Sequence, residues 1–94
     1  MLTYHVAYYQ DVDGITVEAL DFPGVISCGS DFDQARMMIQ SALVEMAEYL
    51  LDNGKPLPIP NPSITDENAD FAEPMHLLLT AAPQYEIVAR QASA

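Results

Sequence analysis

Residues 20–35 read LDFPGVISCGSDFDQA and place a chain reversal, a short apolar run and a helix start in one stretch. Pro23 has a fixed φ angle and no backbone N–H donor, and Gly24 permits the reversal. The chain therefore turns at residues 22–24. We predict that the next residues, VISC at 25–28, form a short strand.

A long helix is predicted directly after this strand. Residues 29–31 turn the chain and make Asp31 the N-cap, and Asp33 and Gln34 place side-chain oxygens near the unpaired N–H groups of the first turn. Asn53-Gly54 ends the helix. Seven apolar residues between these ends recur at three- and four-residue steps and form a stripe that we expect to pack on a sheet. They are Phe32, Ala35, Ile39, Ala42, Leu43, Met46 and Leu50.

A β-hairpin is predicted before the reversal. Residues 3–9, TYHVAYY, are rich in aromatic and β-branched side chains, and residues 15–20 alternate in polarity. Asp13-Gly14 supplies the backbone freedom that a tight connection needs. Together with residues 25–28, these runs predict an antiparallel meander.

The rest of the chain predicts one further strand. Residues 55–62, KPLPIPNP, are expected to run extended, and residues 64–74 to form an acidic loop that is mobile or contacts a partner. Residues 75–82 read as a buried strand, and residues 83–94 as another strand or a tail. The sequence thus predicts a single α+β domain over residues 1–94, with the order β-β-β-α-β and one long helix covering one face of the sheet.

Composition limits the classes of partner. The chain of 94 residues has 14 acidic and three basic residues, for a formal net charge of −11, which disfavours binding to nucleic acid and favours a basic partner. It has one cysteine, no run long and apolar enough to cross a membrane, and no signal-peptide pattern at its start. We therefore expect a cytoplasmic protein.

No catalytic constellation is apparent, and no cofactor is expected. Asp11, Asp13, Glu18 and Asp21 could in principle form a metal-dependent nuclease site, but turn acids are usually solvated and Phe22 stands where a calcium loop needs a glutamate. His5 and His76 fall in predicted strands, where a structural imidazole is expected. Cys28 has no basic neighbour, so a small buried apolar role is predicted.

Five signals resemble the HicB-like antitoxin family in their order and spacing. The stretch YHVAYYQDVDGITVEALDFPGVISCGSDFDQA contains a strand, a D-x-DG hairpin, a D-x-PG turn and a helix start, and SALVEMAEYL and DNGKPLPIPNP supply the helix and a P-x-P-x-P exit. The similarity covers residues 3–63, about two thirds of the chain. It implies a partial ribonuclease-H-like fold without nuclease chemistry, which oligomerises and neutralises a small basic RNA-cleaving HicA toxin.

The chain departs from this family pattern in three places. Val25 stands where a cysteine is often seen, and Asp31 where a threonine often caps the helix, and both keep the physical role. Many such antitoxins carry a ribbon-helix-helix or helix-turn-helix module after this domain. Residues 64–94 show no recognisable DNA-binding module of this kind, so we expect no direct binding of nucleic acid by this chain alone.

Two sets of residues are predicted to contact other molecules. The acids expected to face a basic toxin-like partner are Asp11, Asp13, Asp66, Glu67, Asp70 and Glu73. A second apolar strip on the helix and an apolar edge strand are either scattered surface residues or an interface of a dimer or tetramer. The interface residues would be Met37, Val44, Leu51, Leu77 and Leu79.

Three functions are compatible with these observations. The first is a non-enzymatic interaction protein that occludes a HicA-like toxin. The second is a solitary HicB-like oligomer that acts as a regulatory or assembly subunit without a toxin. The third, least favoured, is a residual metal-dependent nuclease that uses the hairpin acids.

Overall fold

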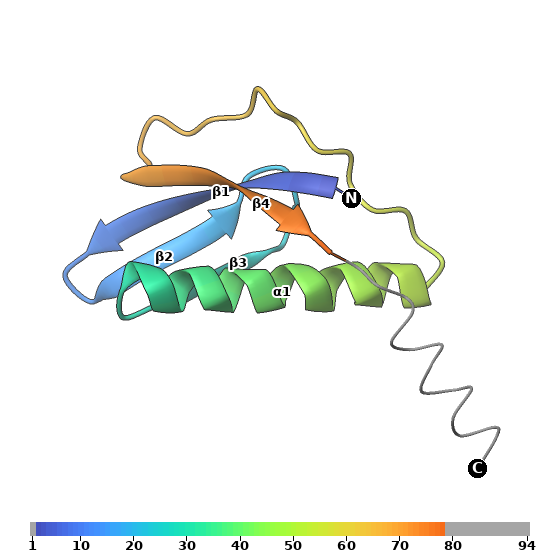
Figure 1. Cartoon of the computed structure of the whole chain (residues 1–94), viewed down its shortest axis with the longest axis horizontal. Helices are drawn as coiled ribbons and strands as arrows, with labels where there is room; N and C mark the ends of the chain where they lie inside the picture. Colours follow the sequence, from blue (N-terminus) through green and yellow to red (C-terminus); the bar gives the residue numbers. More distant parts are fainter. Residues whose placement is uncertain (1, 79–94) are drawn as a thin grey trace, which may run out of the picture.

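The computed structural model describes residues 2–78 and shows one antiparallel sheet covered by one helix (Figure 1). The strands are β1 (Leu2–Asp11), β2 (Gly14–Ala19), β3 (Ile26–Gly29) and β4 (Phe71–Leu77), and the helix is α1 (Phe32–Asp52). The strand order is β3-β2-β1-β4. The predicted meander and the α+β class are confirmed.

The hairpin and the helix form where the sequence predicts them. Asp11 pairs with Gly14, which leaves Val12 and Asp13 as a two-residue loop. The Asp31 side chain accepts a hydrogen bond from the Gln34 amide at 2.8 Å, so Asp31 is the N-cap. Asn53 is the C-cap, as predicted.

The fourth strand begins earlier than predicted. β4 starts at Phe71, inside the predicted acidic loop, because residues 71–77 pair in register with residues 2–8 of β1. The loop therefore ends at Asp70. The predicted strand at residues 75–82 is confirmed for residues 75–77, residue 78 lies beyond the strand, and residues 79–82 lie outside the described part of the chain. Residues 79–94, and with them the predicted second strand or tail, lie outside the described part of the chain.

The core lies between the helix and one face of the sheet. Buried residues of α1 pack on alternating residues of β1 and β2 and on the C-terminal half of β4, and Phe22 from the reversal joins this core. Ala35, Ile39 and Leu43 of the predicted stripe are buried, and Phe32, Ala42, Met46 and Leu50 pack against them. Alternation along the strands thus places Tyr4, Val6 and Tyr8 inside and Thr3, His5 and Tyr9 on the other face.

The segment between α1 and β4 passes on the side of the sheet away from the helix in Figure 1. This segment connects the end of α1 to the start of β4, the edge strand beside β1, and these two points lie at opposite ends of the sheet in Figure 1. Within residues 2–78, no helix is sufficiently long and apolar to span a bilayer.

Candidate functional site

Carboxylates gather at the hairpin end of the molecule. Asp11 ends β1 and Asp13 lies in the two-residue turn; both are exposed, and the Asp13 amide donates to the Asp11 carboxylate at 2.8 Å. Val12 between them is 98% exposed. The turn therefore presents two charges and one apolar side chain to solvent.

The loop before β4 adds acids that are anchored to β1. The Asp70 carboxylate accepts a hydrogen bond from the Gln10 amide at 2.7 Å. The Tyr9 hydroxyl lies 2.6 Å from Asp66 and 2.9 Å from Glu18. The hydrogen bond from Tyr9, followed by that from the Asn68 amide, holds the pKa of Asp66 below its ordinary value.

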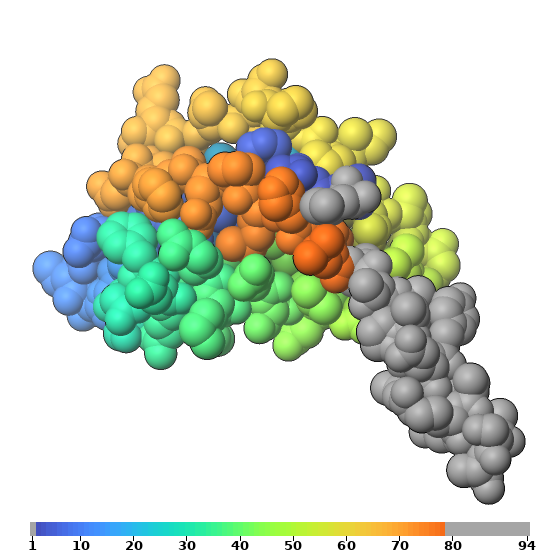
Figure 2. Space-filling view, in the orientation of Figure 1, coloured from blue at the N-terminus to red at the C-terminus, as the bar shows by residue number. Residues whose placement is uncertain are grey.

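These acids share one end with the start of the helix. Figure 2 shows the hairpin tip, the first turn of α1 and the loop before β4 at the same end of the molecule. An open hollow of about 460 Å³ lies beside the tip, and Asp11, Asp13 and Met38 are among the residues that line it. Glu67, in the loop before β4, is also exposed. Five of the six predicted partner-binding acids therefore lie at the hairpin or in the loop that is anchored to the end of β1 beside it.

Glu73 differs from the other five because its side chain is occupied within the fold. It is half-buried in β4, and its carboxylate accepts from the Arg36 guanidinium at 2.8 and 3.3 Å and from the Tyr8 hydroxyl. Burial raises the pKa of Glu73, but the bonds from Arg36 and Tyr8 outweigh burial and hold it below its ordinary value. Glu73 fastens β4 to α1.

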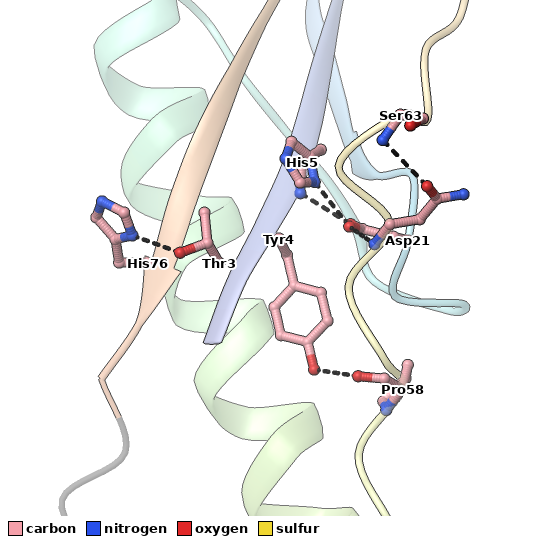
Figure 3. A network of polar contacts seen from close by, with 8 residues as sticks. Thr3, Tyr4, His5, Asp21, Pro58, Ser63 and His76 are labelled. Atoms are coloured by element: carbon pink, nitrogen blue, oxygen red, sulfur yellow. Dashed lines mark hydrogen bonds and ion pairs between the residues drawn. The ribbon is translucent and has the colours of Figure 1, made fainter. Parts of the chain in front are cut away.

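A buried carboxylate holds the proline-rich segment on the sheet (Figure 3). Asp21 is 7% exposed and accepts three hydrogen bonds: from the His5 amide and the His5 Nδ1 at 2.8 Å each, and from the Asn61 amide at 2.9 Å. The Tyr4 hydroxyl donates to the Pro58 carbonyl at 2.6 Å. Burial raises the pKa of Asp21, but the bonds from His5 and Asn61 lower it below its ordinary value.

The sequence places Asp21 in the D-x-PG turn but gives no sign of this role. The Asn61 amide that it binds is 40 residues away, and no local pattern connects the two. His5 has the structural role that the sequence predicts, since its side chain and its amide are both hydrogen-bonded to Asp21. His76 lies on the exposed side of β4, where its Nδ1 is 2.8 Å from the Thr3 hydroxyl.

The acids considered for a metal site do not converge. Asp11 and Asp13 lie at one end of β2, Asp21 follows its other end, and six strand residues span about 20 Å. Glu18 lies between them and contacts Tyr9. No group of three or more potential metal ligands occurs within residues 2–78.

The prediction for Cys28 is wrong, because this side chain is exposed. Ser27 pairs with buried Val17, so Ser27 faces the helix and Cys28 faces away from it. Because β3 has only four residues, the sequence alone does not show which of its side chains face the helix.

The predicted oligomer residues fall in different environments. Met37 and Leu51 are 67% and 51% exposed, whereas Val44 is half-buried against the core and Leu77 is a core residue. Leu79 lies outside the described residues. The side chain of Leu77 therefore stabilises the monomer, and the strip on the helix is interrupted at Val44.

A meander of three strands, a long helix and a fourth strand returning beside the first define a HicB-type fold, and comparison with solved structures confirms the resemblance. The chain is similar to the N-terminal domain of the Burkholderia pseudomallei antitoxin HicB, with a TM-score of 0.65 and 19% identity over 83% of this chain and all of that one. It is similar to the B. pseudomallei antitoxin HicB itself with the same score and identity, over 99% of this chain and 86% of that one.

A further similarity involves a structure that contains a toxin. The chain matches one from a HicA3 and HicB3 toxin–antitoxin complex with a TM-score of 0.56 and 25% identity, over 63% of this chain and 69% of the other. No protein-family model and no curated protein matches the sequence.

Proposed function

We propose that this chain is an antitoxin-like binding protein, which neutralises a small basic RNA-cleaving toxin of the HicA kind by covering it. The observation that carries the proposal is the 25% identity to a chain of a toxin–antitoxin complex, over a shared fold. The proposed mechanism requires no chemistry of this chain's own. It needs a surface complementary to the partner in shape and charge.

The hairpin end supplies the charge. The proposed contacts are Asp11 and Asp13, which line one open hollow, and Asp66, Glu67 and Asp70 in the loop before β4. Asp66 and Asp70 are held in place by Tyr9 and Gln10, so less side-chain freedom is lost when a basic side chain binds them. Glu73 belongs to the fold and is not part of this surface.

Charge and apolar contacts would have different roles. A formal net charge of −11 attracts a cationic partner and speeds encounter, and this effect weakens as salt screens it. Exposed Val12 at the tip and Met38 in the hollow offer apolar area, which sets how long the complex lasts. Because the toxin acts on RNA, we place the interaction in the cytoplasm.

The test is an RNA-protection assay. The purified chain is mixed with the small Lys- and Arg-rich protein encoded next to its gene, and cleavage of a labelled RNA is followed. Stoichiometric loss of cleavage supports the proposal. Cleavage that continues at excess chain, or the absence of a basic neighbour, overturns it.

Paired variants locate the surface. Asp11→Asn/Asp13→Asn removes two charges from the hairpin tip, and Glu45→Gln/Asp52→Asn removes two exposed charges from the helix. The tip variant should associate about tenfold more slowly at low salt, while the helix variant stays within about twofold of the unmodified chain. Equal effects of the two variants would contradict the proposed surface.

A further inference from the structure

The direction of the main-chain groups in β1 fixes their direction in β4. The His5 amide donates to the Asp21 carboxylate, and the His5 carbonyl accepts from the Leu20 amide, so both groups of His5 point towards β2. Because this direction alternates along a strand, the even-numbered residues of β1 point towards β4. They are paired with the odd-numbered residues of β4. The main-chain groups of the even-numbered residues of β4 therefore point away from the sheet.

The outer edge of β4 is consequently open to a further strand. Ala72 and His76 each direct an N–H and a C=O group outward, and Pro74 directs a C=O group. Within residues 2–78, β4 has no neighbouring strand on this side. The N–H group that Pro74 lacks would also point outward, so proline here does not weaken the pairing with β1.

A groove runs between this edge and the helix, and we call it the α1–β4 groove. It consists of two open hollows, of about 400 and 280 Å³, which share Gln40, His76 and Leu78 among their lining residues. The larger hollow also borders Val44 and Leu77. Figure 2 shows β4 lying along α1 on the visible face. The apolar part of the groove is therefore next to the main-chain groups that lack a partner.

The chain itself continues from this groove. Leu78, which lines both hollows and is 66% exposed, is the last described residue, and residues 79–94 follow it in the sequence. A segment that is tethered beside its site has an effective concentration of roughly millimolar. The chain's own continuation therefore reaches the groove before any molecule in solution.

The sequence of this continuation fits a strand. Residues 85–90 read YEIVAR, and tyrosine, isoleucine and valine favour strands. Tyr85, Ile87 and Ala89 alternate with Glu86 and Arg90, so a strand would have one apolar side and one side with two charges.

We propose that residues 85–90 pair antiparallel with the outer edge of β4 as an additional strand and close the α1–β4 groove. Residues 79–83 form the turn, a common length for a hairpin loop. In this register Glu86 lies opposite His76, and the pair exchanges two main-chain hydrogen bonds. Val88 lies opposite Pro74, whose carbonyl accepts the hydrogen bond that this pair can make.

The same register distributes the side chains by their chemistry. Tyr85 and Ile87 lie opposite Leu77 and Met75, on the side of the sheet that faces the helix, and cover the groove. Arg90, one of three basic residues, lies at the acidic start of β4.

A shift of one residue would exchange the two sides and place Glu86 in the groove, so the register is well specified. The additional strand also covers an edge that could otherwise pair with another molecule.

Hydrogen exchange in the full chain tests the proposal. The His76 amide points outward and has no acceptor within residues 2–78, so its protection reports the additional strand. We expect this amide to exchange at least about tenfold more slowly than an unprotected amide. Exchange of His76 at the unprotected rate in the unmodified chain overturns the proposal.

A matched pair of variants tests which side of the strand faces the groove. Ile87→Lys places a charge in the groove and should return the His76 amide to the unprotected rate. Val88→Lys introduces the same charge at the next residue, on the solvent side, and should leave exchange within about twofold. Equal effects of the two variants overturn the proposal.

Dilution identifies the molecule that supplies the strand. Pairing within one chain does not depend on concentration, so the protection of His76 should stay unchanged when the chain is diluted about tenfold. Protection that falls on dilution would assign the strand to another molecule and overturn the proposal.

Cross-linking tests the register in a Cys28→Ser background. His76→Cys/Glu86→Cys should be joined within one chain by a short bis-thiol reagent, because opposite residues have Cβ atoms about 5 Å apart. His76→Cys/Ile87→Cys places the two thiols on opposite faces of the sheet and should react less. Equal yields from the two pairs contradict the proposed pairing.

Discussion

The two sides of the sheet are held by different forces. On the β3 side, the helix approaches the strand so closely that Gly29 has no room for a side chain. On the β1 and β4 side, long-range polar contacts fasten the chain: Asp21, which also binds His5 of β1, to Asn61, Tyr9 to Asp66 and Glu73 to Arg36. The first side depends on shape and leaves an uncharged edge, whereas the second depends on side-chain carboxylates and ends in an edge that carries a proline.

The largest effect is expected from filling the close approach on the β3 side. Gly29→Ala places a Cβ atom 2.4 Å from the Ala35 amide nitrogen, and neither backbone can yield without moving the helix start. We expect the free energy of unfolding, measured with urea, to fall by about 3 kcal/mol. Gly54→Ala is the control, since Gly54 has φ +69° but open space around it, and should cost about 1 kcal/mol. Equal losses would show that the approach at Gly29 is not tight.

A slightly smaller effect is expected from the polar side. Asp21→Ala leaves the amides of His5 and Asn61 without their acceptor in a buried site, which should cost about 2 kcal/mol. Asp13→Ala removes an exposed turn carboxylate and should change stability by less than about 0.5 kcal/mol. Urea unfolding of both variants checks this, and a neutral Asp21→Ala would remove the structural role given to that carboxylate.

Acid should weaken the polar side selectively. The pKa values of Asp21 and Glu73 in the folded chain lie below their ordinary values of 3.8 and 4.5. Their stabilisation is therefore complete above the ordinary values and is lost as the pH falls through them towards the folded values, because the unfolded chain binds the protons first. Hydrogen exchange followed from pH 6 to about pH 3 should show the Asn61 amide losing protection before the amide of Ser27, which bonds within the β3 side. Simultaneous loss at both positions would contradict the distinction.

The smallest effect on the monomer is expected at the β3 edge. Ile26→Lys should change the free energy of unfolding of the chain, measured with urea, by less than about 0.5 kcal/mol, because the side chain is exposed. A large loss under these conditions would mean that Ile26 stabilises the fold itself.

The part of the fold that local patterns determine could be predicted from the sequence. Asp is a preferred N-cap residue and Pro-Gly favours a chain reversal. The start of the helix at Asp31 and the turn at Pro23-Gly24 can therefore be predicted from local sequence. The start of β4 could not be predicted, because Phe71 joins the sheet by pairing with Tyr8, which is distant in sequence. Pro74 also lowers the strand propensity of this segment. Cys28 was misplaced because four residues give too little alternation to assign the two faces.

The candidate site was predictable in part for a similar reason. Charges in a turn, such as Asp11 and Asp13, are exposed wherever the turn lies. Glu73 has the same residue type, but its partner Arg36 is 37 residues away, and only the folded chain brings them together. The sequence therefore identifies the acidic residues, and the packing of the folded chain decides which of their carboxylates are free to contact a partner.

Sedimentation of this chain with its basic partner at two salt concentrations tests the account most directly. Between about 50 mM and about 500 mM salt, the screening of charge should release the basic partner from the acidic hairpin end. A partner that stays bound at high salt would contradict the assignment of the acidic hairpin end as the binding surface.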